Sequence, residues 1–373
     1  MQQVMFAWLV VEVLHEDPAR VGTAQMVGTL PAVIFLLLGG ALADRFERRN
    51  TMVFTHLAGG VTALVLVGVL LGDHLGFGLV LVYAAVWGTL HAIHLPARDA
   101  MLFDVGKRAL SRAVPGTTLV QFGGQAGGNL LVGAATWLGA PAVLGMQSLL
   151  VLSGAGVVSK LPRSQLAADR VHRHPLREIR DGVRIVFTST RLRSLTLLIS
   201  LNGVFFIGPY FVLVPLLLRD VYGGGVGELS ILMMMFPLGT IAASTALLWL
   251  GHVPHRGRVH FAGQLLGGLC LLGIWTTPGY PVLLGLSFVW GLGGGAFLNM
   301  GRTLFLESAP ESHRGRCLSV YTLALLGMAP IGTQLAGLVG EAVGAAAGCG
   351  LAGGAMLALL AALFLATPVR HFD

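Results

Sequence analysis

The densest group of charged residues in this sequence follows a run of small residues, in the stretch GGALADRFERR. Gly40 lets two helices approach closely, and the Asp44 carboxylate can accept hydrogen bonds from an arginine or from a helix N-terminus. A carboxylate beside several guanidinium groups can form ion pairs that hold one conformation and later release it. We therefore predict a conformational latch made of Gly40, Asp44, Arg45, Arg48 and Arg49.

Two arginines elsewhere are each followed by an acid at a similar distance. Arg98 precedes Asp104, and Arg302 precedes Glu307. Each pair follows a long apolar run, at matching places in the two halves of the chain. Two parallel repeats would conserve such pairs as gating contacts. We predict that all four residues take part in the latch, although arginines beside a membrane also occur for topology alone.

Several amide side chains lie inside apolar runs, where facing lipid would be costly and facing a cavity would not. None of these side chains carries a charge. We predict that they line a central substrate cavity, and the candidates are Gln125, Asn129, Asn202, Asn299 and Gln334.

Candidates for carrying a proton are fewer. His91 and His94 lie three residues apart, on one face of a helix, and imidazole titrates near neutral pH. Glu12 is an acid within the first apolar run. A structural hydrogen bond is the alternative role of the histidines, and a position among lipid headgroups is the alternative for Glu12.

No constellation in the sequence points to an enzyme. Phosphate-binding GxxxxGK[ST] loops, HExxH helices and GxSxG elbows do not occur. Cys270, Cys317 and Cys349 are scattered and form no CxxC pattern, so we expect reduced thiols, no metal site and no cofactor.

The elements that position these residues are membrane spans. Hydrophobic residues make up 55% of the 373 residues and charged residues only 11%, whereas soluble domains carry about 25% charged residues. Apolar runs of about 20 residues, each long enough to cross a bilayer, recur throughout. The sequence therefore predicts an all-α polytopic membrane protein with twelve spans, near 1–14, 20–43, 51–72, 75–97, 114–138, 141–160, 194–218, 228–251, 259–277, 281–303, 318–340 and 344–367.

A polar, arginine-rich stretch at 161–193 divides the spans into an N-terminal six-helix bundle, 1–160, and a C-terminal one, 194–373. If this linker is cytoplasmic, 22 of the 24 lysines and arginines lie on the cytoplasmic side; Arg20 and Arg219 are the exceptions. This asymmetry is typical of cytoplasmic loops, so we predict a cytoplasmic linker and C-terminus. Basic residues placed this way indicate membrane topology, and we expect no binding of nucleic acid.

The first predicted span is short. Its 14 residues reach only about 21 Å along a helix axis, less than a bilayer core of about 30 Å. Two explanations stay open: the true start lies upstream of Met1, or the chain is a truncated copy. The second would make the chain an inactive or non-transporting membrane protein.

GGALADRFERR, placed between the second and third predicted spans, resembles the loop signature GxLaDrxGrR of the major facilitator superfamily. The resemblance implies a twelve-helix fold of two pseudo-symmetric bundles that work by alternating access. It gives Asp44 and Arg45 a role in holding the outward-facing state. Glu47 departs from the signature, since the family usually has glycine there. The resemblance also places His56 and Gln264 on peripheral helices, as packing residues.

Four longer stretches resemble the transmembrane secretion effector branch of this superfamily, which includes the enterobactin exporter and macrolide efflux proteins. They are MQQVMFAWLVVEVL with ALADRFERR, PAR with the acidic loop after it, PLREIRDGVRIVFTSTRLRSL, and PESHRGRCLSVYTLALLGMAPIGTQLAGLVGEAVG. This likeness implies a monomer in a bacterial cytoplasmic membrane that exports a small amphipathic molecule, such as a siderophore, a macrolide or another drug, in exchange for protons. QFGGQAGGN resembles a degenerate antiporter signature without its usual Gly-Pro pair, so an uptake facilitator stays open as the alternative.

Overall fold

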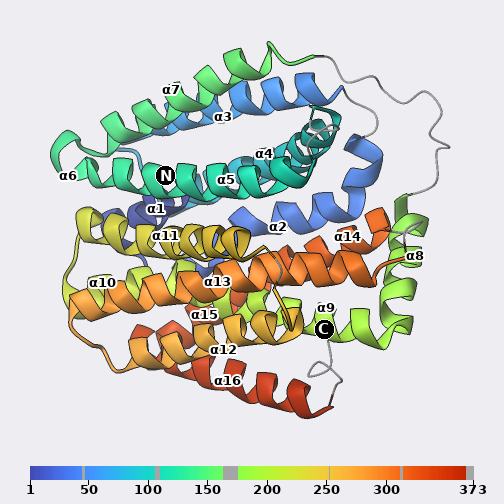
Figure 1. Cartoon of the computed structure of the whole chain (residues 1–373). Helices are drawn as coiled ribbons and strands as arrows, with labels where there is room; N and C mark the ends of the chain where they lie inside the picture. The colour runs from blue at the N-terminus through green and yellow to red at the C-terminus, as the bar shows by residue number, and fades with distance from the viewer. Residues whose placement is uncertain (44–46, 106–109, 163–174, 252, 311–313, 367–373) are drawn as a thin grey trace.

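The computed structural model describes residues 1–43, 47–105, 110–162, 175–251, 253–310 and 314–366 (Figure 1). Within these ranges every regular element is a helix. The first group of elements, here called the N-terminal group, consists of α1 (Gln2–Trp8), η1 (Leu9–Val13, a π-helical turn), α2 (Pro18–Ala43), α3 (Arg48–Leu71), α4 (Phe77–Val105), α5 (Leu110–Gly133), α6 (Ala135–Leu138) and α7 (Ala140–Val158).

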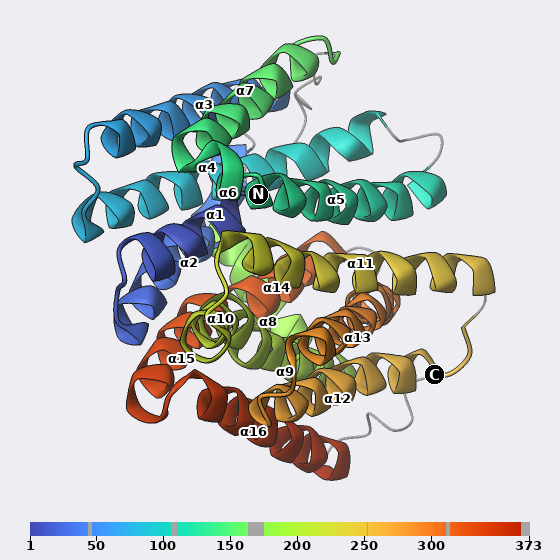
Figure 2. The same ribbon diagram turned by 90° about the vertical axis from the view of Figure 1, so that its left-hand side faces the viewer.

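After α8 (Pro175–Thr188), the remaining elements form the C-terminal group. They are α9 (Thr190–Asn202), the π-helical turns η2 (Gly203–Ile207) and η3 (Pro209–Leu213), α10 (Val214–Tyr222), α11 (Val226–Leu250), α12 (Arg256–Trp275), α13 (Tyr280–Ser308), α14 (Arg314–Leu326), α15 (Ala329–Val343) and α16 (Ala345–Ala366). The two groups lie side by side, with α5 against α11 and α2 against α15 (Figure 2).

Nine helices in the described ranges are long and apolar enough to cross a membrane. They cover 48–71, 77–98, 140–158, 190–222, 226–250, 256–275, 280–308, 320–343 and 345–365. The other three predicted spans correspond to α1 with η1, which is shorter, to α2 and to α5. Large apolar side chains are widely exposed on these helices, for example Phe54, Val120 and Trp249. Such a surface needs lipid around it, and the chain is a multi-pass membrane protein.

The helices have two ends that differ in charge. At one end, here called the basic end, lie Arg49, Lys160 and Arg256, and α8 runs across it, roughly perpendicular to the other helices (Figure 1). The other, here called the opposite end, carries Arg219 and the turns before α7, α11 and α16.

Two glycines make matching turns at the opposite end. Gly139 precedes α7 with φ 78° and ψ 160°, and Gly344 precedes α16 with φ 84° and ψ 158°. Only glycine adopts such positive φ values without strain. The last long helix of each group therefore begins from a turn of the same backbone geometry.

The main hydrophobic core joins the two groups near the opposite end. Met5 and Leu9 from the N-terminal group and Leu213, Leu216 and Leu217 from the C-terminal group are fully buried in one cluster. This packing fixes the ends of α1, α2, α10 and α15 against one another and encloses one end of the cavity described next.

Candidate functional site

A cavity of about 260 Å³ lies between the two groups. Four of its lining residues come from α1 and α5, and sixteen come from the C-terminal group. The four are Gln3, Gln121, Phe122 and Gln125, and the sixteen include Asn202, Phe206, Tyr210, Phe236, Gln264, Trp290 and Phe297. None of the described residues in this lining is charged, and they offer aromatic faces and amides to a ligand.

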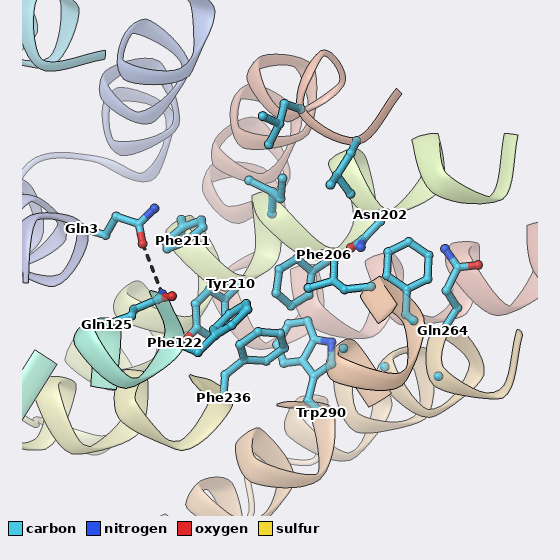
Figure 3. A pocket seen from close by; sticks show the side chains of 18 of the residues that line it. Gln3, Phe122, Gln125, Asn202, Phe206, Tyr210, Phe211, Phe236, Gln264 and Trp290 are labelled. Carbon is cyan, nitrogen blue, oxygen red and sulfur yellow. Dashed lines mark hydrogen bonds between the residues drawn. The ribbon is translucent and has the colours of Figure 1, made fainter. Parts of the chain in front are cut away.

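Four aromatic side chains from three helical segments meet at the centre of this cavity, and we call them the aromatic cluster: Phe206, Tyr210, Phe236 and Trp290 (Figure 3). The ring of Phe206 lies 4.8 Å from that of Phe236 and 5.1 Å from that of Trp290, centroid to centroid. Tyr210 donates its hydroxyl to the Met233 carbonyl at 2.9 Å. Edge and tilted contacts of this kind are favourable ring geometries, and they give the cavity a firm apolar wall.

Amides lie on two sides of the aromatic cluster (Figure 3). On one side Gln125 donates to the Gln3 side-chain oxygen at 3.4 Å. On the other side are Asn202 and Gln264, and Gln264 donates to the Leu198 carbonyl at 2.5 Å. Gln264 was interpreted as a packing residue. It is buried, but α12 is close enough to the cavity for its side chain to line it.

Three of the five predicted cavity amides are absent from the described lining of this cavity and hydrogen-bond to neighbouring helices instead. Asn129 donates to the Met233 carbonyl at 2.9 Å and so joins α5 to α11. Asn299 donates to Ser244 Oγ at 2.9 Å, within the C-terminal group. Gln334 accepts a hydrogen bond from Thr23 at 3.2 Å, between α15 and α2. Each of these amides forms at least one hydrogen bond to a neighbouring helix, whereas Gln125 and Asn202 lie in the lining.

The opposite end is closed by contacts between the groups. Arg219 donates to the Val11 carbonyl at 3.1 Å and to the Glu16 carbonyl at 3.3 Å. Gly22 and Gly337 bring the backbones of α2 and α15 together, because a Cβ added at Gly337 would lie 2.8 Å from Gly22 Cα. The cavity is therefore sealed toward this end.

Part of the predicted latch lies outside the described residues, namely Asp44 and Arg45. Gly40 and Asp104 lie in α2 and α4, and their side chains are likewise outside the description. The other members are Arg48 at the start of α3, Arg49 in its first turn, Arg98 in α4, and Arg302 and Glu307 in α13.

Two described members of the latch have partners within their own group. Arg49 donates to the Ser159 and Leu161 carbonyls at 3.4 and 3.3 Å, which satisfies orphan carbonyls at the end of α7. Glu307 forms an ion pair with Arg256 at the start of α12. The acid after Arg302 thus ties α13 to α12 in this conformation.

Glu47, the departure from the family signature, caps α3. Its carboxylate accepts hydrogen bonds from the backbone N–H groups of Arg49, at 3.3 Å, and Asn50, at 3.0 Å. These N–H groups have no partner within the helix, and a negative charge at a helix N-terminus is favourable. Glycine at this position could not supply the carboxylate.

We predict that Glu47→Ala lowers the free energy of unfolding by about 1 kcal/mol, the usual cost of losing a helix cap. Glu47→Asp should lose less, because aspartate can cap the same N–H groups. Thermal unfolding of the purified chain in detergent, followed by circular dichroism, measures the effect. Equal stability of Glu47→Ala and the parent chain would contradict the capping role.

The three predicted proton carriers lie in two places. Glu12 lies in η1 near the opposite end, partly buried and close to Arg219. His91 and His94 lie in α4 and line a second, smaller cavity within the N-terminal group. In the described ranges no group of three or more His, Cys, Asp or Glu residues is arranged to hold a metal ion.

No pattern in the sequence distinguishes the four residues of the aromatic cluster. Phe206, Tyr210, Phe236 and Trp290 lie in long apolar runs, where an aromatic residue facing a cavity has the same sequence surroundings as one facing lipid. The sequence does not show which predicted spans pack together. To find the cluster, one would need to know that three of them do, those at 194–218, 228–251 and 281–303.

Known proteins resemble this chain along most of its length. The profile of a family described as transmembrane secretion effector matches residues 1–373. The staphyloferrin A transporter of Staphylococcus aureus is 23% identical over 352 residues, which cover 92% of this chain and 86% of the relative. The multidrug efflux pump Tap of Mycolicibacterium fortuitum is 25% identical over 363 residues, which cover 91% and 85%.

A solved structure shares the fold. The crystal structure of the nucleoside transporter NupG superposes with a TM-score of 0.75 at 14% identity, covering 97% of this chain and 93% of that chain. At this identity the likeness concerns the arrangement of helices and not the ligand. These relatives are transporters and not enzymes.

Proposed function

Because this chain belongs to the transmembrane secretion effector family, a branch of the major facilitator superfamily, we propose that it exports a small amphipathic molecule by alternating access. The relatives whose names state a cargo or an activity transport a siderophore or pump out drugs. The observation that carries the proposal is the cavity of about 260 Å³ between the two groups, with aromatic and amide walls.

The proposed architecture has twelve spans in two six-helix bundles. The N-terminal group contributes α1 with η1, α2, α3, α4, α5 and α7, and the C-terminal group contributes α9 to α10, α11, α12, α13, α14 with α15, and α16. The matching turns at Gly139 and Gly344 support a parallel repeat. The basic end faces the cytoplasm of a bacterial cell, in keeping with 22 of 24 basic residues, and the chain acts as a monomer among lipids.

The cavity lining favours a cargo with a large apolar body and few polar groups. Aromatic side chains give such a cargo contact area, and a few amides fix its orientation. A siderophore with several negative charges would need cationic partners, and the described residues of this lining include none. Among the cargoes of the relatives, we therefore place a drug-like aromatic compound ahead of a siderophore.

Alternating access requires the two groups to seal the cavity first at one end and then at the other. The contacts of Arg219 and of Gly22 with Gly337 correspond to the state closed at the opposite end, which is cytoplasm-facing in the proposed orientation. Cargo enters in this state. The latch residues at the basic end then hold the alternate, outward-facing state, and inward movement of protons supplies the energy.

The proposal is tested in bacterial cells that lack endogenous drug pumps and express the full chain. We expect these cells to retain less ethidium, an aromatic cation, than cells with an empty vector, and an uncoupler should abolish the difference. Asp44→Asn should lower efflux at least about 10-fold, because removing one charge from a latch of ion pairs removes the interactions of one state. Membrane insertion, measured by immunoblot of the membrane fraction, should be unchanged.

If cells with and without the protein retain equal amounts of every drug in a panel of aromatic drugs, the protein does not export them, and the proposal is contradicted. Higher retention in expressing cells would indicate uptake. Normal efflux by Asp44→Asn would remove the latch from the mechanism and leave export intact.

A further inference from the structure

A second cavity, of about 150 Å³, lies between α3, α4 and α7 of the N-terminal group. Its described lining shares no residue with that of the first cavity, which lies between the two groups. Three imidazoles face it, those of His56, His91 and His94, and we call these residues the histidine cluster. The rest of the lining is Thr55, Gly59, Trp87, Leu90 and Val151.

Thr55 of α3 lies between a backbone carbonyl and the ring of His94. Its Oγ1 is 2.9 Å from the Met52 carbonyl oxygen and 3.0 Å from His94 Nδ1. When Thr55 donates its single hydrogen to the carbonyl, it accepts from Nδ1–H of neutral His94, and Nε2 keeps a lone pair that can bind a proton.

His56 completes the cluster from α3. Its ring centroid lies 5.0 Å from that of His94 at an interplanar angle of 79°. The ring fits over Gly154 of α7, where an added Cβ would lie 2.8 Å from it. His91 is one helical turn before His94 on α4. Each of the three helices thus contributes to holding the imidazoles near one another.

The charges around the cluster limit how many protons it can take. Among the residues described in this lining, the three histidines are the ones that can carry a charge. Arg98 lies one turn beyond His94 on α4 and supplies a fixed positive charge. A proton on one imidazole is repelled by Arg98, and a second proton would be repelled by the first as well.

We propose that the histidine cluster is the binding site of the coupling proton, and that this site is separate from the cargo cavity. The inference rests on the proposed function as an exporter. The proton binds to an imidazole lone pair, such as that of His94 Nε2, from the outside medium and leaves the same atom toward the cytoplasm. With separate sites, the cargo and the proton do not compete for the same atom. They would compete if both bound to one carboxylate.

The link between the two sites runs through α4. A protonated His94 places a second positive charge one turn from Arg98, which is a predicted member of the latch. Repulsion between the two displaces the basic end of α4 and favours one of the two states of the groups. Cargo binding, which favours the other conformation, then releases the proton.

The test counts protons released by the purified full chain in weakly buffered detergent solutions at a series of pH values from about 4 to about 7. Ethidium is a suitable cargo probe because it keeps its positive charge throughout this range. At the pH of greatest release, we expect about one proton released per bound ethidium. In His56→Gln and His94→Gln, release should fall to less than about one fifth, and the Kd for ethidium should lose its dependence on pH, because a proton that binding displaces also opposes binding.

His260→Gln is the matched control, because His260 is a buried histidine that lies outside the histidine cluster, in the C-terminal group on α12. Proton release per bound dye should be that of the parent chain. Undiminished release in a variant with all three cluster histidines replaced would overturn the proposal, as would equal loss in His260→Gln. Ethidium binding without any proton release by the parent chain would overturn it too while leaving export standing, whereas failure to bind or export any probe would remove both.

Discussion

Gly337→Ala is expected to lower transport at least about 10-fold, although it adds only one methyl group. A Cβ at this position would lie 2.6 Å from the Pro18 carbonyl oxygen and 2.8 Å from Gly22 Cα. Both atoms belong to the backbone, so α2 and α15 must separate to make room. Because these two helices belong to different groups, the methyl acts against closure of the opposite end. A shift of about 1.4 kcal/mol toward the open state is enough for the 10-fold effect.

The conformational shift can be measured apart from transport. Gln334 belongs to α15 and accepts a hydrogen bond from Thr23 of α2. A cysteine at this position should react faster with a membrane-impermeant maleimide in the Gly337→Ala background. The three native cysteines are buried and contribute little labelling. Gly145→Ala on α7 is the matched control, since an added Cβ there meets no atom within 4 Å. Normal efflux and unchanged labelling in Gly337→Ala would show that the close approach has no role in the cycle.

The sequence was sufficient to predict helices but not their interruptions. The predicted span at 194–218 contains two π-helical turns around Gly208 and Pro209, and the span at 318–340 breaks between α14 and α15, just before Pro330. Average hydropathy does not register such local departures, because a π-helical turn has the same composition as an α-helical one. They matter here because Phe206 and Tyr210, two members of the aromatic cluster, lie in the interrupted part of the first span.

The candidate site was harder to predict than the helices for a related reason. The sequence indicates that an amide in an apolar run needs a polar partner, but not whether the partner is a cargo or a neighbouring helix. Asn129 and Asn202 look alike by this criterion, yet Asn129 bonds the α11 backbone while Asn202 lines the cavity. The sequence likewise does not show that the ring of His56 lies beside that of His94, which is 38 residues away in the chain. Distances between helices decide these roles.

Charges introduced at Asn202 are expected to have the second large effect, in opposite directions for cations and anions. Asn202 lies beside the aromatic cluster (Figure 3), and the described residues of the cavity lining carry no charge. A carboxylate at this position should strengthen binding of ethidium about 10-fold or more, and a guanidinium should weaken it about 100-fold. Two unit charges about 4 Å apart interact by about 4 kcal/mol at an effective dielectric constant of about 20, and part of this energy offsets the desolvation of the new charge.

Anilinonaphthalene sulfonate, an aromatic anion, should respond in the reverse sense. We expect Asn202→Asp to bind ethidium more tightly than the parent chain, and Asn202→Arg to bind the anion more tightly, in titrations of the purified protein followed by fluorescence. Asn299→Asp and Asn299→Arg are matched controls, because Asn299 is an amide of the same group that bonds Ser244 outside the lining. If both dyes respond alike to both charges, or if the Asn299 variants reproduce the Asn202 pattern, the dyes bind elsewhere and the cavity between the groups is not the cargo site.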